Sequence, residues 1–201
     1  MQHRLGRTRW GRVTGYMMAL TLGVAGTAEA QTGAGRGLFV GLQYAGASVS
    51  VKEAAENLEF GSGFGLHAGF GVSDNVAVLV NFDRNVLTRR RDDQDVTVSQ
   101  YDALLRYQLF PGADSPVRVF GTAGATGRAA SGTTEFEGVA PTAGAGVQLH
   151  VSSSVALTGT ALWTFGNLTS LRELTGGGTT RETFRSTATR VQVGASLYLF
   201  R

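Results

Sequence analysis

Apolar side chains alternate with small or polar ones at a period of two residues over most of this chain. Residues 60–72 show it best: apolar side chains fill almost every second position, and five glycines and His67 lie between them. From residue 37 onward no window keeps a helical period beyond a turn or two, and a period of two is typical of β-strands. Eight segments share the pattern: residues 37–50, 60–72, 76–87, 97–110, 117–128, 139–151, 155–165 and 185–200. The sequence therefore predicts an all-β fold of eight strands.

The connections between these segments alternate in length. The short ones are rich in Ser, Asp, Asn, Pro and Gly and cover residues 73–75, 111–116 and 152–154. The long ones are polar and cover residues 51–59, 88–96, 129–138 and 166–184. A membrane-spanning barrel keeps this order, with short periplasmic turns and long outer loops. A soluble sandwich or lipocalin-like barrel, which is the alternative, need not keep it.

Each segment has one apolar face and one polar, glycine-rich face. In hydrocarbon every backbone N–H and C=O needs a partner in the protein, so a spanning sheet has to close. Every segment supplies the roughly 9–11 residues with which a tilted strand crosses a bilayer. We therefore predict an eight-stranded antiparallel up-and-down transmembrane β-barrel, apolar towards lipid and polar towards a lumen that side chains fill. We expect inward glycines to make room for Arg106, Arg118, Arg190 and Tyr198, and Pro141 to lie at the outer rim of its strand.

The first 30 residues differ from the rest. Residues 1–12 carry four Arg and no acidic residue, residues 13–28 are apolar and small, and Ala28-Glu29-Ala30 fits a small-x-small cleavage pattern. This order predicts a cleaved signal peptide over residues 1–30 and a barrel over residues 31–201. An N-terminal membrane anchor is the alternative, although the apolar run is short and contains three glycines.

Composition limits the partners and the chemistry. The chain has 18 Lys+Arg and 15 Asp+Glu, and removing the four Arg and one Glu of the predicted signal leaves 14 of each. The excess of basic residues thus belongs to the signal, and we expect no nucleic-acid partner. The absence of cysteine excludes disulfide-stapled modules, thiolate metal sites and cysteine nucleophiles.

Together these features resemble the small eight-stranded outer-membrane barrels of the OmpA/OmpX-like group. The resemblance covers residues 31–201 and includes the last strand, which is similar to the C-terminal signal of such barrels at Gln192, Gly194, Tyr198 and Phe200. This chain departs from that signal by ending in Phe200-Arg201, and its alternation places Leu197 and Leu199 on the lipid face. The resemblance implies a monomer in the cell outer membrane that contacts outer-membrane lipids and lipopolysaccharide. It also implies help from periplasmic chaperones and the outer-membrane assembly machinery.

The inward positions carry a set of charges, with Asn81, Gln108 and Gln148 near them in register. These charges are Asp83, Asp102, Arg106, Arg118 and Arg190. A buried charge persists only when it is paired and hydrogen-bonded. We therefore predict an internal ion-pair network that plugs the lumen; in the resembling family such networks are structural, and a gate over a narrow water path is the alternative.

No set of residues predicts catalysis or a cofactor. His150 and Ser152 have the spacing of the pair used by lipid A deacylase barrels of the PagL type, but they abut the short turn 152–154, and no carboxylate is evident beside them. Only two histidines lie beyond the predicted signal, so a histidine metal site is not expected. The glycine run 176–178 lacks the following helix and Lys of a phosphate-binding loop and is expected to be a loop tip.

A charged loop follows the third segment. It contains Arg89, Arg90, Arg91, Asp92, Asp93 and Asp95. Arginines beside aspartates could bind lipopolysaccharide head groups or hold divalent cations, or they could simply neutralise one another in solvent. The sequence as a whole predicts a non-catalytic outer-membrane protein with a structural or loop-mediated role, in adhesion or envelope integrity. A narrow channel, a lipid-modifying barrel enzyme and a soluble ligand-binding barrel are the alternatives.

Overall fold

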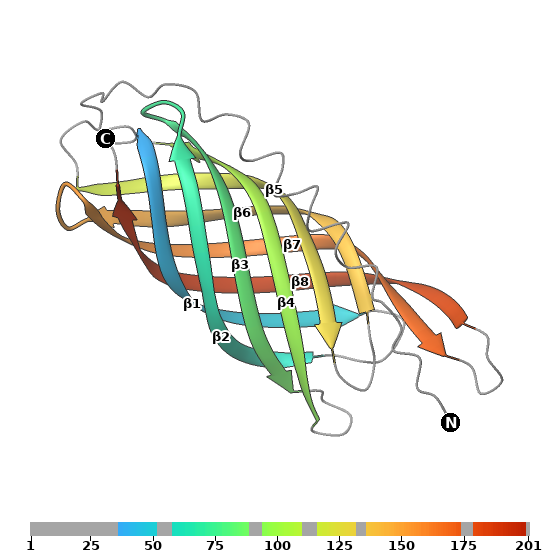
Figure 1. The fold of residues 1–201 in the computed structure, drawn as a ribbon. Coiled ribbons are helices and arrows are strands. Elements are labelled where there is room, and N and C mark those ends of the chain that lie inside the picture. The colour runs from blue at the N-terminus through green and yellow to red at the C-terminus, as the bar shows by residue number, and fades with distance from the viewer. Residues whose placement is uncertain are drawn as a thin grey trace, which may run out of the picture. The chain divides into compact units, whose positions relative to one another are not determined.

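Eight antiparallel strands follow one another in chain order around a closed barrel (Figure 1). The computed structural model describes residues 36–51, 58–88, 94–109, 116–131, 136–173 and 179–199. The strands are β1 (Gly37–Val51), β2 (Leu58–Gly71), β3 (Val76–Thr88), β4 (Asp95–Gln108), β5 (Val117–Ser131), β6 (Phe136–His150), β7 (Val155–Glu173) and β8 (Thr179–Tyr198). The barrel closes where β1 pairs with β8, for example at Leu42 and Ala195. The predicted eight-stranded barrel is confirmed.

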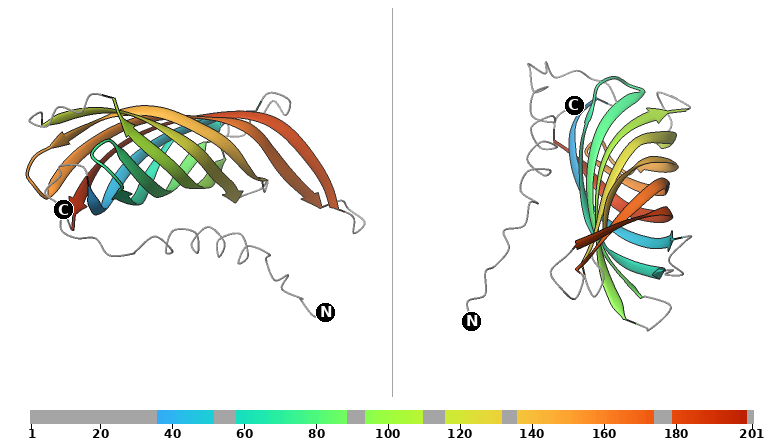
Figure 2. Two further views of the ribbon diagram at one scale, coloured as in Figure 1. Left: turned by 90° about the horizontal axis from the view of Figure 1, so that it is seen from above. Right: turned by 90° about the vertical axis from the view of Figure 1, so that its right-hand side faces the viewer.

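The strand ends differ most from the prediction in β7 and β8. These strands have 19 and 20 residues, and their pairing continues from Asn167 and Arg185 to Glu173 and Thr179. In Figure 2 this hairpin extends past the other strands at the right of the left-hand view. Most of the segment 166–184, expected to be a loop, is therefore strand. Its sequence did not show this because neither face of the hairpin is consistently apolar there.

Two of the short turns share one design. In the turn after β2, Val72 and Ser73 donate their backbone N–H groups to the Val76 carbonyl, and the Ser73 hydroxyl accepts from the N–H of Val76. The turn after β6 repeats these bonds with Val151, Ser152 and Val155. A Val-Ser-x-x-Val sequence thus satisfies its own backbone groups at both turns.

The outside of the barrel is apolar, as the prediction requires for a lipid-facing surface. More than half of the residue's surface is exposed at Leu42, Phe60, Phe64, Leu66, Val139 and Val193. Soluble proteins rarely expose so much contiguous apolar surface. No helix among the described residues is long and apolar enough to cross a membrane.

The lumen is not polar throughout, contrary to the prediction. Near the long connections it is filled by a loop-side apolar layer made of Val49, Leu58, Leu87, Val96, Val98, Ala130 and Ala188. Near the short turns it is filled by a turn-side apolar layer made of Phe39, Ala77, Leu79, Leu104, Ala156, Leu162 and Tyr198. Buried polar side chains that include Asp83, Asp102 and Arg190 lie between the two layers, whereas Arg118 and Gln148 pair beside the short turns. The middle of the lumen is therefore polar and has an apolar layer on each side.

Inward glycines do make room, but for other groups than those predicted. A Cβ added at Gly65 would clash with the Asp83 carboxylate, and one at Gly41 would clash with the His67 ring. Gly69 and Gly146 similarly leave space for Phe39 and Phe120. The space beside these glycines is therefore not occupied by the side chains predicted to use it, which are those of Arg106, Arg118, Arg190 and Tyr198.

Pro141 lies inside β6 rather than at its rim, which corrects the prediction. The β6–β7 pairing stops at Glu137–Thr169 and resumes at Thr142–Thr164, whereas on the other side Pro141 is paired with Ala125 of β5. Proline has no N–H to donate. The strand tolerates Pro141 because one of its two ladders is interrupted beside it.

Candidate functional site: the central polar network

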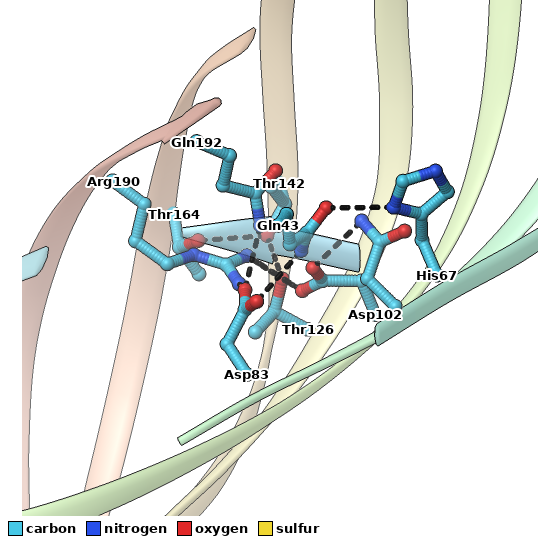
Figure 3. Close-up of polar contacts among 10 residues, drawn as sticks. Gln43, His67, Asp83, Asp102, Thr126, Thr142, Thr164, Arg190 and Gln192 are labelled. Carbon is cyan, nitrogen blue, oxygen red and sulfur yellow. Dashed lines mark hydrogen bonds and ion pairs between the residues drawn. The ribbon is translucent and has the colours of Figure 1, made fainter. Parts of the chain in front are cut away.

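An ion triad of Asp83, Asp102 and Arg190 occupies the middle of the lumen (Figure 3). Arg190 Nη1 lies 2.8 Å from Asp83 Oδ2, and Arg190 Nη2 lies 2.6 Å from Asp102 Oδ1. The three side chains are at most 1 % exposed. One guanidinium from β8 therefore holds two carboxylates, from β3 and β4, that would otherwise be buried without a countercharge.

Amides from β1 and β8 complete the hydrogen bonding of Asp83. Gln43 Nε2 donates to Asp83 Oδ1 and Gln192 Nε2 donates to Asp83 Oδ2, both at 2.6 Å. His67 of β2 connects Gln43 of β1 with Ser196 of β8. Its Nδ1 lies 3.1 Å from Gln43 Oε1, and its Nε2 lies 2.8 Å from Ser196 Oγ. Asp83 Oδ1 thus accepts from a neutral amide, and Oδ2 accepts from a guanidinium and a second neutral amide.

Asp102 is held by an amide and by a relay of hydroxyl groups. Asn81 Nδ2 donates to Asp102 Oδ2 at 3.2 Å, and Thr126 donates its hydroxyl to Asp102 Oδ1 at 2.6 Å. Because the Thr126 proton is used in this way, Thr126 accepts from Thr142 at 2.5 Å, and Thr142 accepts from Thr164 at 2.8 Å. The negative charge of Asp102 therefore sets the direction of every hydroxyl in the relay.

These side chains form what we call the central polar network: Gln43, His67, Asn81, Asp83, Asp102, Thr126, Thr142, Thr164, Arg190 and Gln192. Every one of the eight strands contributes at least one member. The network thus joins the whole circumference of the barrel through its lumen. Beside the network the lumen contains a small cavity of about 20 Å³.

The structure places the other two predicted members elsewhere. Arg106 lies over the ring of Phe120, with its guanidinium carbon 4.1 Å from the centroid, and Arg118 Nη1 donates to Gln108 Oε1 at 3.2 Å. Arg106 is four residues along β4 from Asp102, or about 13 Å at the usual strand rise. Alternation gave the correct face for Arg106 and Arg118, but they lie at a different height, nearer the short turns.

Sequence reasoning missed most of the uncharged members of the network and one buried arginine. Thr126, Thr142 and Thr164 sit at inward positions, but threonine is common on both faces of these strands. Arg128 was recognised as inward but not as part of the charge set, and it is 3 % exposed with Nη2 donating to Ser186 Oγ at 3.3 Å. Arg128 and Arg118 are separated by an even number of positions along β5, so their side chains point to the same face. This spacing was the signal that could have added Arg128 to the predicted charge set.

Comparison with known proteins now identifies the family. The family model described as "Outer membrane protein beta-barrel domain" matches residues 17–197. The chain belongs to this family. Similar solved structures include the outer membrane protein OprG from Pseudomonas aeruginosa, with 10 % identity, a TM-score of 0.63 and coverage of 84 % of this chain and 99 % of that chain. Neisserial surface protein A is 15 % identical, with a TM-score of 0.60 and coverage of 81 % and 97 %.

A third similar structure is that of the outer membrane protein AlkL in DMPC lipid bilayers, with 11 % identity, a TM-score of 0.61 and coverage of 88 % and 96 %. At these identities the likeness establishes the fold alone. The search of curated proteins gave no significant match. Membership of the outer-membrane β-barrel family supports a location in the outer membrane.

In the last strand of this outer-membrane barrel, β8, the side chains point to the faces that the alternation predicts. Gln192 and Tyr198 are buried in the lumen, whereas Leu197 and Leu199 are about half exposed on the outside. Tyr198 accepts a 2.9 Å hydrogen bond from Gln148 Nε2 and its ring packs against Phe39 and His150. Gly194 pairs with Gln43 of β1, and Phe200 lies outside the described residues. Gln192, Gly194 and Tyr198, which the sequence predicts as part of an assembly signal, therefore have structural roles in the barrel.

The possible His150–Ser152 pair is arranged as part of a turn. The Ser152 hydroxyl accepts hydrogen bonds from the N–H groups of Ser154 and Val155, and the His150 ring packs against Tyr198 with 5.6 Å between centroids. Ser152 is exposed at the end of the barrel that carries the short turns. Its oxygen therefore caps the turn by accepting from two backbone N–H groups.

Three other predicted features lie outside the described residues: the signal peptide 1–30, the glycine run 176–178, and Arg89, Arg90, Arg91, Asp92 and Asp93 of the charged loop. Asp95 of that loop is described at the start of β4, where its carboxylate accepts a 3.3 Å hydrogen bond from the Thr88 hydroxyl. In the described part of the chain, His, Asp and Glu form no cluster of three or more that could hold a metal ion.

Proposed function

We propose that this protein is a non-catalytic outer-membrane barrel with a closed lumen, which supports envelope integrity and presents its long connections at the cell surface. The observation that carries the proposal is the central polar network, because all eight strands bond across the lumen around Arg190. A barrel cross-linked in this way is rigid and filled. Family membership supplies the outer-membrane setting.

The lumen contents argue against the narrow channel. An ion moving through would have to break the charged bonds of Arg190 and then pass apolar layers at both ends. Desolvating an ion in an apolar constriction is costly. The lipid-enzyme alternative is the weaker candidate because Ser152 lies in an exposed short turn that its oxygen caps.

The surface role belongs to the outer end of the barrel. We place there the long connections and the projecting hairpin of β7 and β8, which is the largest departure from an even rim (Figure 2). The arginines at positions 89–91 would bind the phosphates of lipopolysaccharide, since guanidinium groups suit bidentate phosphate contacts. Export through the signal peptide, delivery by periplasmic chaperones and insertion by the assembly machinery through the last strand, as a monomer, complete the proposal.

A complementation experiment tests the proposal. A strain lacking the protein should become more sensitive to detergent, and the full chain should restore resistance. Variants in which residues 52–57, 89–93, 132–135 or 174–178 are replaced one at a time by a short turn should still fold, as judged by heat-modifiable migration on gels. At least one should lose surface binding or detergent resistance. If the deletion strain is indistinguishable from its parent in both properties, the proposed function is wrong.

The lipopolysaccharide contact has its own test. An Arg89→Ala/Arg90→Ala/Arg91→Ala variant should co-purify with less lipopolysaccharide than the parent, and a variant with Asp92→Ala/Asp93→Ala is the matched control for general disturbance of the loop. Unchanged co-purification in the arginine variant contradicts the contact while leaving the envelope role to be judged by complementation.

A further inference from the structure

A small cavity lies in the lumen between the central polar network and the turn-side apolar layer. Its volume is about 20 Å³, and it is lined by Arg106, Thr122 and Thr158 and, on the network side, by His67, Asn81 and Gln192. A cavity of roughly 10–15 Å³ already holds a water molecule. This one therefore has room for one or two waters or for one small ion.

Three buried donors at this cavity have no hydrogen-bond partner in the part of the chain that the structure describes. They are Nε of Arg106 and the hydroxyl groups of Thr122 and Thr158. All three side chains are more than nine-tenths buried. Arg106 and Thr122 face each other across the β4–β5 ladder, and Thr158 comes from β7. Buried donors without partners are costly and rare, so their gathering at one cavity indicates a bound acceptor.

The charges of the lumen indicate the sign of that acceptor. Among the described residues the buried charged side chains comprise four arginines, Arg106, Arg118, Arg128 and Arg190, against two aspartates, Asp83 and Asp102. Both carboxylates are bonded to Arg190. The guanidinium of Arg106 meets the rings of Phe120 and Phe39, which attract a cation but carry no formal charge. The cavity thus adjoins a buried positive charge that lacks a counterion.

We propose that the cavity binds one small monovalent inorganic anion of the size of chloride, held by Arg106, Thr122 and Thr158. The Arg106 N–H and the two threonine hydroxyls donate to it, and its charge compensates the guanidinium. A water molecule in the same place would fill the volume but would leave the charge of Arg106 unbalanced. This site does not depend on the proposed envelope role.

Bromide is the probe that locates the anion. Crystals of the protein purified from outer membranes and grown in sodium bromide should show an anomalous peak at hydrogen-bond distance from Arg106 Nε and from the Thr122 and Thr158 hydroxyls. The peak should disappear in Arg106→Met and persist in Arg118→Met, which removes a neighbouring lumen arginine that does not line the cavity. A cavity that holds only water in bromide, or a peak that survives Arg106→Met, overturns the proposal.

Solution measurements cover the case in which Arg106→Met does not fold. The unfolding midpoint of the parent should rise when sodium gluconate is replaced by sodium chloride at constant ionic strength. Thr158→Val keeps the side-chain shape but removes one donor. The chloride concentration that gives half of the rise in unfolding midpoint should be about 10-fold higher in this variant, as expected for the loss of one hydrogen bond to an ion. A midpoint that is equal in the two salts, or an unchanged chloride dependence in Thr158→Val, contradicts the site.

Discussion

Gly65 lies directly opposite Asp83 in the β2–β3 ladder, and the missing side chain of Gly65 leaves the space that the Asp83 carboxylate occupies. From that space Asp83 accepts hydrogen bonds from Gln43, Arg190 and Gln192. The absence of a side chain at Gly65 thus allows the Asp83 carboxylate to sit at the centre of the polar network.

Gly65→Ala is therefore expected to destabilise the barrel by about 1–3 kcal/mol, because the added methyl group displaces a carboxylate that three donors hold in place. Gly159→Ala is the matched control, since a Cβ at Gly159 meets nothing within 4 Å. The free energy of unfolding in urea, measured on both variants in lipid vesicles, checks this. Equal losses in the two variants would show that the space beside Asp83 has no special role.

Arg190→Met is expected to cost about 3–5 kcal/mol, since it leaves two buried carboxylates without their cation. The triple variant Asp83→Asn/Asp102→Asn/Arg190→Met should regain much of this loss, because it removes the buried charges altogether. The same unfolding measurement compares the two. A triple variant that is less stable than Arg190→Met would contradict a role for the charge balance.

Thr142→Val should cost about 1–3 kcal/mol at nearly constant volume, because it interrupts the hydroxyl relay from Thr164 to Thr126. Thr142→Ser, which keeps the hydroxyl, is the control and should lose less. Adding Thr164→Val to Thr142→Val should cost little more, since the relay is already broken. Fully additive losses in the double variant would mean that the threonines do not act as one chain.

Ser152→Ala should lower stability by roughly 0.5–1.5 kcal/mol through loss of the hydroxyl that accepts from two turn N–H groups. Ser153→Ala, in the same exposed turn, is the control. Mass spectrometry should show the same lipid A acyl pattern with the parent and with Ser152→Ala. A change in acyl pattern that requires Ser152 would revive the lipid-enzyme interpretation.

Alternation predicted the strands wherever one face has to be apolar. It placed Leu42, Phe64 and Val193 on the outside and Asp83 and Arg190 on the inside, as the structure has them. It failed in β7 after Phe165 and in β8 before Arg185, because neither face of the hairpin is consistently apolar there. It also gave no indication of the loop-side apolar layer, whose members continue the inward positions of the same strands.

The central polar network was harder to predict. An alternation with a period of two residues shows which face of the sheet a side chain lies on, but it does not show the position of that side chain along the barrel axis. Asp83 and Asp102 come within reach of Arg190 only through the pairing of β3 with β4 and of β8 with β1. Arg106 has the same parity as Asp102 but opposes Ala77, close to the short turn. Register between strands therefore decides which inward charges meet, and one sequence does not fix that register.

Planar-bilayer recording of the purified, heat-modifiable protein tests whether the lumen is closed. Insertion is verified in parallel by protection of the barrel from added protease. We expect no discrete conductance steps, because the side chains bonded around Arg190 and the two apolar layers fill the lumen. Discrete steps from the unmodified protein, altered in conductance by Arg190→Met, would contradict it.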